Sequence, residues 1–207
     1  MVEFRKCLET IIEHPNLHGK WLNTLSYLEN CGARMIAACE HPTMVPKEVL
    51  KHAAEEFRHA YYLKSQVEKV LPGGLGNYQL MEMLGGYPAR HYMGRLNIHI
   101  SRYLRYCRGV TGRRLREYGY LLVTYAIEIR AKEIYPLYQS LLKQSGSSIS
   151  VSNIIREEEQ HLQEITEQME GTPAEEWKDE VLEIEDCLFE RFQNCLILET
   201  QERRECL

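Results

Sequence analysis

Apolar residues recur at intervals of three and four along most of this 207-residue chain. That spacing is typical of amphipathic helices, each of which buries one stripe of side chains. Prolines at first turns, Ser/Asn caps and glycine-rich breaks mark where the helices begin and end. The pattern therefore predicts an all-α protein with five long helices, over about residues 20–39, 46–70, 113–142, 150–170 and 173–204.

The segments before and between the first two helices contain helix-breaking residues. Residues 1–19 are expected to form a short leader, helical near 4–12 and broken at Pro15 and Gly19. A second break is expected over residues 40–46, where Pro46 suits the first turn of the helix that follows.

Residues 71–111 are too long for a tight turn and indicate a crossover connection. The segment opens with Leu-Pro-Gly-Gly, contains Gly85-Gly86, and has one short helix expected near 95–107. The helix over 173–204 follows a Thr-Pro-Ala-Glu capping pattern. It can pack on the rest of the chain or on a second subunit of a homodimer, and the sequence leaves both arrangements open.

Ionisable residues interrupt the apolar stripes of three helices. Glu29 lies within the stripe of the first, and Glu-x-x-His occurs in the second as Glu56/His59 and in the fourth as Glu158/His161. Residues three apart on a helix project from one face, so each Glu and His can share a metal ion. A carboxylate on an apolar face is costly unless it is paired or bound to metal.

These residues, together with Glu128 of the third helix, form a loose internal repeat. Glu56 and Glu158 lie 102 residues apart, and Glu29 and Glu128 lie 99 apart, so the two halves keep nearly the same spacing. Glu128 lies on the flank of the third helix, where Glu133 is a competing carboxylate that points further from the apolar centre. A single Glu-x-x-His is weak support for a metal site, but the repeated set is much less probable by chance.

Two helices that each supply one Glu, and two that each supply Glu-x-x-His, resemble the ferritin-like di-iron carboxylate superfamily over about residues 20–170. The resemblance implies a four-helix bundle with a long crossover, because its second and third helices run parallel. It implies two iron ions, with manganese in one or both positions left open. The six implied metal ligands, also the catalytic residues, are Glu29 and Glu128 as terminal ligands, Glu56 and Glu158 as bridges, and His59 and His161.

The function that this resemblance implies is the dioxygen-dependent oxidation or hydroxylation of an organic substrate, with electrons from a separate donor. The absence of any Cys-x-x-Cys pair argues against a rubrerythrin with a rubredoxin-type iron site. Two alternatives stay open: a ferroxidase or iron-handling protein, and a non-catalytic helical interaction module. A buried polar network without metal is disfavoured, because six ionisable groups in one core would be expensive.

Composition places the chain in an ordinary class. A hydrophobic fraction of 44%, a charged fraction of 27% and a net charge of −5 are typical of a water-soluble protein, and the length suits one domain over 1–207. No apolar run is long enough to predict a membrane span, and the first residues lack a signal-peptide core. Seven scattered cysteines, an odd number, indicate a reducing cytoplasm.

The segment 89–116 has no acidic residue but eight Arg and two His, interleaved with tyrosines. One interpretation is an anionic substrate such as a nucleotide or tRNA, held by charge and stacking. The other is internal pairing with the seven acids of residues 175–186.

Several residues near the motifs have no assigned role. Tyr62 and Tyr125 lie one turn from a predicted ligand, and either they contact a ligand or they are packed aromatics. The six histidines outside the motifs have no spacing that links them to the site: His14, His18, His41, His52, His91 and His99.

Overall fold

A computed structural model describes residues 2–39, 43 and 46–205, and within these residues every regular element is helical. The long helices are α1 (Val2–Glu13), α2 (Pro15–Cys39), α3 (Lys47–Val70), α4 (Gly86–Tyr106), α5 (Gly112–Gln144), α6 (Ser152–Met169) and α7 (Lys178–Glu205). Two short 3-10 helices, η1 (Leu80–Glu82) and η2 (Pro173–Trp177), precede α4 and α7.

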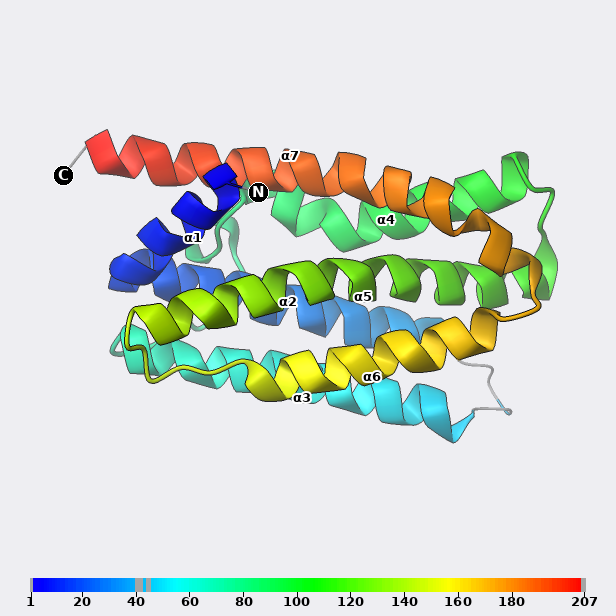
Figure 1. Cartoon of the computed structure of the whole chain (residues 1–207), viewed down its shortest axis with the longest axis horizontal. Coiled ribbons are helices and arrows are strands. Elements are labelled where there is room, and N and C mark those ends of the chain that lie inside the picture. The colour runs from blue at the N-terminus through cyan, green and yellow to red at the C-terminus, as the bar shows by residue number, and fades with distance from the viewer. Residues whose placement is uncertain (1, 40–42, 44–45, 206–207) are drawn as a thin grey trace.

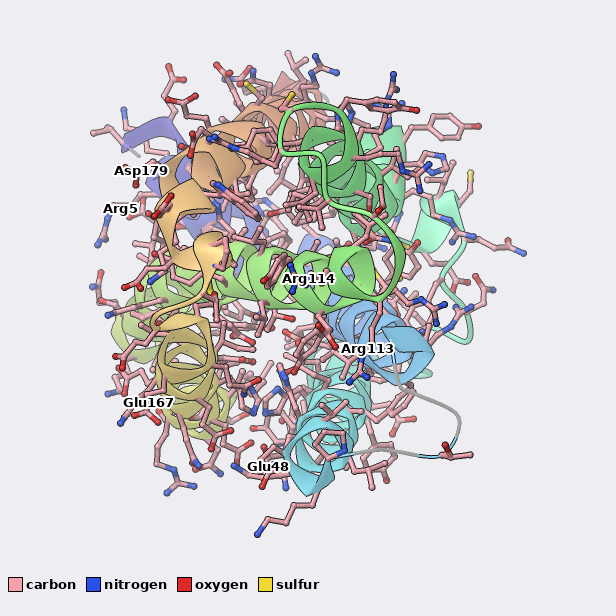
Figure 2. The ribbon with its side chains drawn as sticks, turned by 90° about the vertical axis from the view of Figure 1, so that its right-hand side faces the viewer. Arg5, Glu48, Arg113, Arg114, Glu167 and Asp179 are labelled. Carbon is pink, nitrogen blue, oxygen red and sulfur yellow. The ribbon has the colours of Figure 1, made fainter. Side chains whose placement is uncertain are left out.

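The helices lie in three layers (Figures 1 and 2). Helices α2 and α5 form the middle layer, α3 and α6 cover one side of it, and α4 and α7 cover the other. α1 lies across one end, against α2 and α7. α3 and α5 run in the same direction, and the chain between them crosses the molecule through α4 (Figure 1).

The apolar core lies between the middle layer and α4 and α7. Trp21 of α2 is fully buried, with ring centroids 6.3 Å from both Tyr138 of α5 and Phe192 of α7. Such aromatic contacts join the layers through large buried areas. α7 thus packs on its own chain, which is the first of the two arrangements that the sequence left open.

The N-terminal prediction is wrong in one respect, because Gly19 does not break a helix. α2 begins at Pro15 and continues through Gly19, which lies where a Cβ would stand 3.2 Å from the side chain of Leu71. The glycine is therefore explained by a close approach between segments rather than by a turn. The break expected over 40–46 lies almost entirely outside the described residues.

The crossover contains more helix than the sequence indicated. α4 has 21 residues instead of a short helix near 95–107, and it begins after Gly85, whose φ of 82° favours glycine. Its buried stripe includes Ala89, Tyr92 and Leu96. Exposed Arg and His residues between these positions hid that stripe. No helix among the described residues is both long and apolar enough to cross a membrane.

Candidate metal centre

The inward faces of α2, α3, α5 and α6 bring all six predicted ligands together with one further histidine. We call these residues the His/Glu cluster: Glu29, His52, Glu56, His59, Glu128, Glu158 and His161. They form two groups in which the ligand atoms lie within 4.8 Å of one another. One group is Glu29, Glu56, His59 and Glu158, and the other is His52, Glu56, Glu128 and His161.

Two carboxylates lie between the groups. Glu56 belongs to both. The Oε1 atom of Glu158 is 3.0 Å from Nδ1 of His59, and its Oε2 atom is 3.1 Å from Nδ1 of His161. Both positions suit the bridging role that the sequence predicted for these residues.

The carboxylate that α5, the third of the predicted long helices, supplies to the cluster is Glu128. It is buried, and its Oε1 atom lies 3.3 Å from Nε2 of His52 and 3.8 Å from Nδ1 of His161. Glu133 is exposed and forms an ion pair with Arg130 instead. The structure therefore separates the two candidates that the sequence left in competition.

His52 belongs to the cluster, and the prediction that it has no link to the motifs is wrong. It lies one helical turn before Glu56, and its Nε2 atom is 3.6 Å from Oε1 of Glu56. Its Nδ1 atom is 3.3 Å from the hydroxyl of Tyr120. The i, i+4 spacing of 52 and 56 was the available signal. The equivalent position of the second half holds Ile154, so this histidine makes the two groups unequal.

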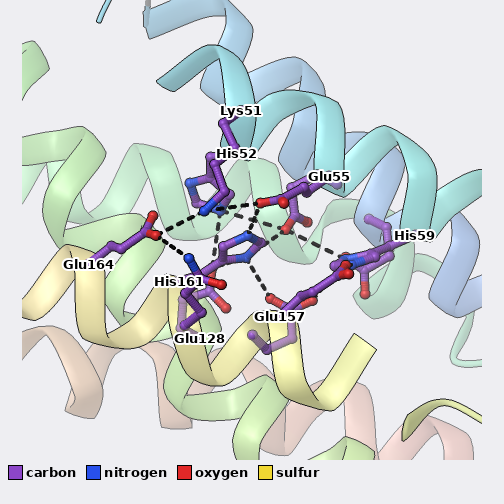
Figure 3. A network of polar contacts seen from close by, with 12 residues as sticks. Lys51, His52, Glu55, His59, Glu128, Glu157, His161 and Glu164 are labelled. Carbon is purple, nitrogen blue, oxygen red and sulfur yellow. Dashed lines mark hydrogen bonds and ion pairs between the residues drawn. The ribbon is translucent and has the colours of Figure 1, made fainter. Parts of the chain in front are cut away.

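Two more carboxylates contact the histidines from outside the cluster (Figure 3). Glu157 of α6 lies 2.7 Å from Nε2 of His59, and Glu55 of α3 lies 2.9 Å from Nε2 of His161. A carboxylate that accepts a hydrogen bond from one ring nitrogen fixes the tautomer and directs the other nitrogen toward a metal. The signal in the sequence was that both motifs read Glu-Glu-x-x-His.

Arginine and lysine side chains at the surface form ion pairs with these outer carboxylates. Arg58 donates to Glu157 over 2.6 Å. Lys51 donates to Glu164 over 2.9 Å and lies 3.8 Å from Glu55 (Figure 3). These contacts are partly exposed, so we expect each to contribute little to folding and mainly to orient Glu55 and Glu157.

Besides Tyr120, Tyr135 contacts the cluster: it is buried and donates a hydrogen bond to Oε1 of Glu29. The two tyrosines singled out from the sequence make other contacts. Tyr62 donates to the backbone oxygen of Ser150, and Tyr125 lies under the ammonium group of Lys178. Both therefore fit the interpretation as packed aromatics.

Unsatisfied polar atoms gather in the cluster. Among the described residues, seven buried side-chain nitrogen or oxygen atoms make no hydrogen bond of good geometry, and five of them belong to the cluster, where His59 Nδ1 and Glu158 Oε1 are an ion pair 3.0 Å apart. They are His52 Nε2, Glu56 Oε1, His59 Nδ1, Glu128 Oε2 and Glu158 Oε1. Buried polar atoms are normally paired because leaving them unpaired is costly. Lone pairs directed at a common space fit metal ions.

Burial and mutual repulsion favour the protonated form of two of the carboxylates when no metal is bound. Burial, reinforced by the charge of Glu56, raises the pKa of Glu29 well above its ordinary value. Burial and the charge of Glu158 raise the pKa of Glu128 in the same way. Both are terminal carboxylates in the predicted site, so metal binding must displace their protons.

Glu56 and Glu158 form charged pairs with the two motif histidines instead. Burial alone would lower the pKa of each histidine, but the Glu158 carboxylate outweighs it, and the pKa rises to about 9 for His59 and about 11 for His161. Burial would likewise raise the pKa of Glu56 and Glu158, but the imidazoles beside them lower it. The metal-free cluster is thus neutralised by protons.

A cavity of about 310 Å³ adjoins the cluster. His52, Glu56 and Glu128 line its inner end, and residues of α2, α4 and α5 form its walls. Its volume lies at the lower end of the range for small-molecule pockets, about 300–1,000 Å³. No protein-family model, curated protein or solved structure matches this chain. The chemistry of the cluster and of this cavity is therefore the ground for a functional proposal.

Proposed function

We propose that this protein is a ferritin-like di-iron carboxylate enzyme that uses dioxygen to oxidise or hydroxylate an organic substrate. The observation that carries the proposal is the His/Glu cluster, with five unsatisfied buried donor atoms next to a cavity. The parallel course of α3 and α5, joined through a long crossover, supports a ferritin-like arrangement (Figure 1).

The donor set fits two divalent ions of the iron or manganese type. Four carboxylates match the four positive charges of two such ions, and imidazole nitrogens complete a mixed oxygen/nitrogen shell. The absence of cysteine from the cluster disfavours the softer thiolate chemistry of zinc or iron–sulfur sites. Glu29 and His59 would hold one ion, and Glu128, His161 and His52 the other. Glu56 and Glu158, which lie between the two groups, would hold both.

Two ferrous ions bound here would supply the reducing equivalents that activate dioxygen, and an external donor would restore them. The net reaction for a hydroxylation is R–H + O₂ + 2e⁻ + 2H⁺ → R–OH + H₂O. Glu157 and Glu55 contact Nε2 of His59 and His161, so they would leave Nδ1 of each ring free to hold an ion. The apolar walls of the cavity keep bulk water from the reacting substrate.

The cavity favours an organic substrate over iron as the substrate. A ferroxidase needs a polar path for ions, whereas the exposed surface of this cavity is mostly apolar. The ferroxidase therefore stands as the second candidate, and it predicts iron uptake beyond two ions per chain. The non-catalytic module predicts that no metal binds.

The decisive test is metal content, measured by elemental analysis after purification without added metal and again after anaerobic iron loading. We expect about two irons per chain. Glu158→Ala should lose most of this iron, because it removes a proposed bridge. Glu159→Ala is the matched control, since Glu159 is the next residue on α6 and is exposed. No bound metal in the unaltered protein under either condition would overturn the proposal.

A further inference from the structure

The cavity has a polarity gradient from its inner end to its mouth. Carboxylates of Glu56 and Glu128 lie at the inner end, and the walls carry apolar residues that include Ile36, Met93 and Val123. At the other end, Arg105 of α4 and Arg116 of α5 line it. A ligand is therefore offered carboxylates at one end, a mostly apolar middle that also includes Asn97, Ser101 and Thr124, and two guanidinium groups at the other.

Arg105 and Arg116 differ from the nearby Arg108 and Arg113, which form ion pairs with glutamates. Arg108 pairs with Glu180 of α7, and Arg113 pairs with Glu117. Arg105 and Arg116 have no ion pair among the described residues, and both are exposed at the cavity. Pairing with the acidic α7 helix thus accounts for Arg108 but not for these two.

Two glycines keep the cavity open. Gly32 of α2 and Gly119 of α5 both line it, both lie inside helices, and neither has a positive φ. Glycine inside a helix destabilises it by about 0.5–1 kcal/mol relative to alanine. Its presence is therefore explained either by a backbone conformation that only glycine adopts or by a need for space beside the Cα atom. A Cβ on Gly119 would meet no described atom within 4 Å. The missing side chain therefore leaves empty space at the wall.

We propose that the cavity binds a medium-chain carboxylate, with its carboxylate on Arg105 and Arg116 and its alkyl chain directed at His52 and the cluster. The orientation follows from charge, because Arg105 and Arg116 offer positive charge at the exposed end, whereas the cluster at the inner end is neutralised and offers an anionic head group no free cation. Arginine binds a carboxylate through two parallel hydrogen bonds, which suits this head group. The claim that this ligand is the substrate rests on the proposed function. The claim that the cavity binds it is independent of that function.

The size of the cavity sets the chain length. At roughly 30 Å³ per group, the share of a water molecule in the liquid, 310 Å³ holds about ten groups. Arg116 and Glu128 are separated by about 18 Å along α5 at 1.5 Å per residue. At about 1.2 Å per bond, this length sets an upper limit of about fifteen atoms, above the ten that the volume allows. A nucleotide is disfavoured by the apolar walls.

Decanoate is the direct probe, and decanol and AMP are the comparison ligands. Binding is measured by titration calorimetry below micelle-forming concentrations, on the metal-free and the iron-loaded full chain. Replacing both arginines (Arg105→Gln with Arg116→Gln) should weaken decanoate binding about tenfold or more and leave decanol binding unchanged. Gly119→Leu should abolish binding of both by filling the cavity. Arg114→Gln is the matched control, because Arg114 is exposed and does not line the cavity (Figure 2).

Failure of this proposal and failure of the proposed function give different results. Decanoate binding that is absent, that survives Gly119→Leu, or that is weaker than AMP binding overturns the ligand assignment. If the same preparation still holds about two irons, the metal site stands. Decanoate binding without any metal uptake would instead keep the ligand and overturn the di-iron function. Iron content of the Gly119→Leu variant is measured in parallel, and a normal value shows that the variant has folded.

Discussion

The carboxylate of Glu157 lies 2.7 Å from Nε2 of His59, and the equivalent Glu55 makes the same contact, at 2.9 Å, with His161. Each Glu-Glu-x-x-His motif therefore supplies a carboxylate to the histidine of the other motif. α3 and α6 are linked reciprocally across the cluster (Figure 3). The second half of the chain repeats the first in its outer contacts as well as in its proposed ligands.

Glu157→Gln tests the role of this outer carboxylate. Such partners usually change metal affinity by about 10- to 100-fold, so we expect the iron affinity to fall by that order while the helix content stays unchanged. Iron affinity is measured by competition with a chelator, and helix content by circular dichroism. Glu159→Gln, two positions along the same helix, is the control. Equal affinities of the two variants would contradict a positioning role for Glu157.

His52 gives a second prediction, because it makes the two metal positions unequal. His52→Ala should weaken one ion selectively, since its Nε2 atom faces Glu56 and Glu128 but the other group lacks it. We expect the variant to retain about one tightly bound iron per chain, with the second more easily removed by chelator. Mössbauer spectra should then show one iron environment where the unaltered protein shows two.

The control for this variant is His99→Ala, at an exposed histidine of α4 outside the cluster. It should hold the same iron as the unaltered protein. Loss of both ions in His52→Ala would mean that His52 supports the whole cluster rather than one position. Retention of both at full affinity would exclude it as a ligand.

The long helices could be predicted from the sequence because their apolar stripes are regular. α3 begins one residue from its predicted start and ends at its predicted end, Val70. α4 was underestimated because exposed charges break up its stripe, and Gly19 was misread because its reason is a long-range contact with Leu71. Local patterns report the face of a helix, but they do not report which distant segment approaches it.

The site shows the same limit. The two Glu-x-x-His pairs stand out because they repeat, and the structure brings all six predicted residues into one cluster; that they bind metal stays a prediction. Periodicity alone did not single out Glu128, because it lies on the flank of the apolar stripe rather than at its centre, although Glu133 lies about 140° further round α5. Tyr135 was missed as a partner of Glu29 because the contact joins α2 and α5, which no local spacing encodes.

Proton release on metal binding gives a third prediction. In the metal-free cluster, raised pKa values keep one proton on each of Glu29 and Glu128, and a second proton on each of His59 and His161. Two divalent ions that replace these protons should release about four per chain near pH 7. Calorimetry in two buffers of different ionisation enthalpy measures the number. Release of fewer than two protons would mean that the metal-free cluster is not neutralised by protons.

The same groups set the pH dependence of the metal-free protein. For the raised groups the folded chain binds the proton more tightly than the unfolded chain, so their contribution to stability is complete below the unfolded pKa and is lost as the pH rises. For His59 this window runs from about 6.5 to about 9. We expect the His59 contribution to the free energy of unfolding to fall across it by an amount on the order of 3 kcal/mol, measured with urea at pH 6.5 and pH 9 as the difference between the unaltered protein and His59→Gln. His161, whose raised pKa spans the same window, adds to the total fall.

Iron-loaded protein should show the opposite trend in the stability that the metal adds, because the ligands must lose their protons to bind it. The increment between metal-loaded and metal-free chains, measured anaerobically in urea, is expected to grow from pH 6.5 to pH 9. His59→Gln is the informative variant, since it removes one of the titrating groups and should make the metal-free curve less steep. A metal-free protein whose stability rises over this range would show that His59 is not held as an imidazolium by Glu158.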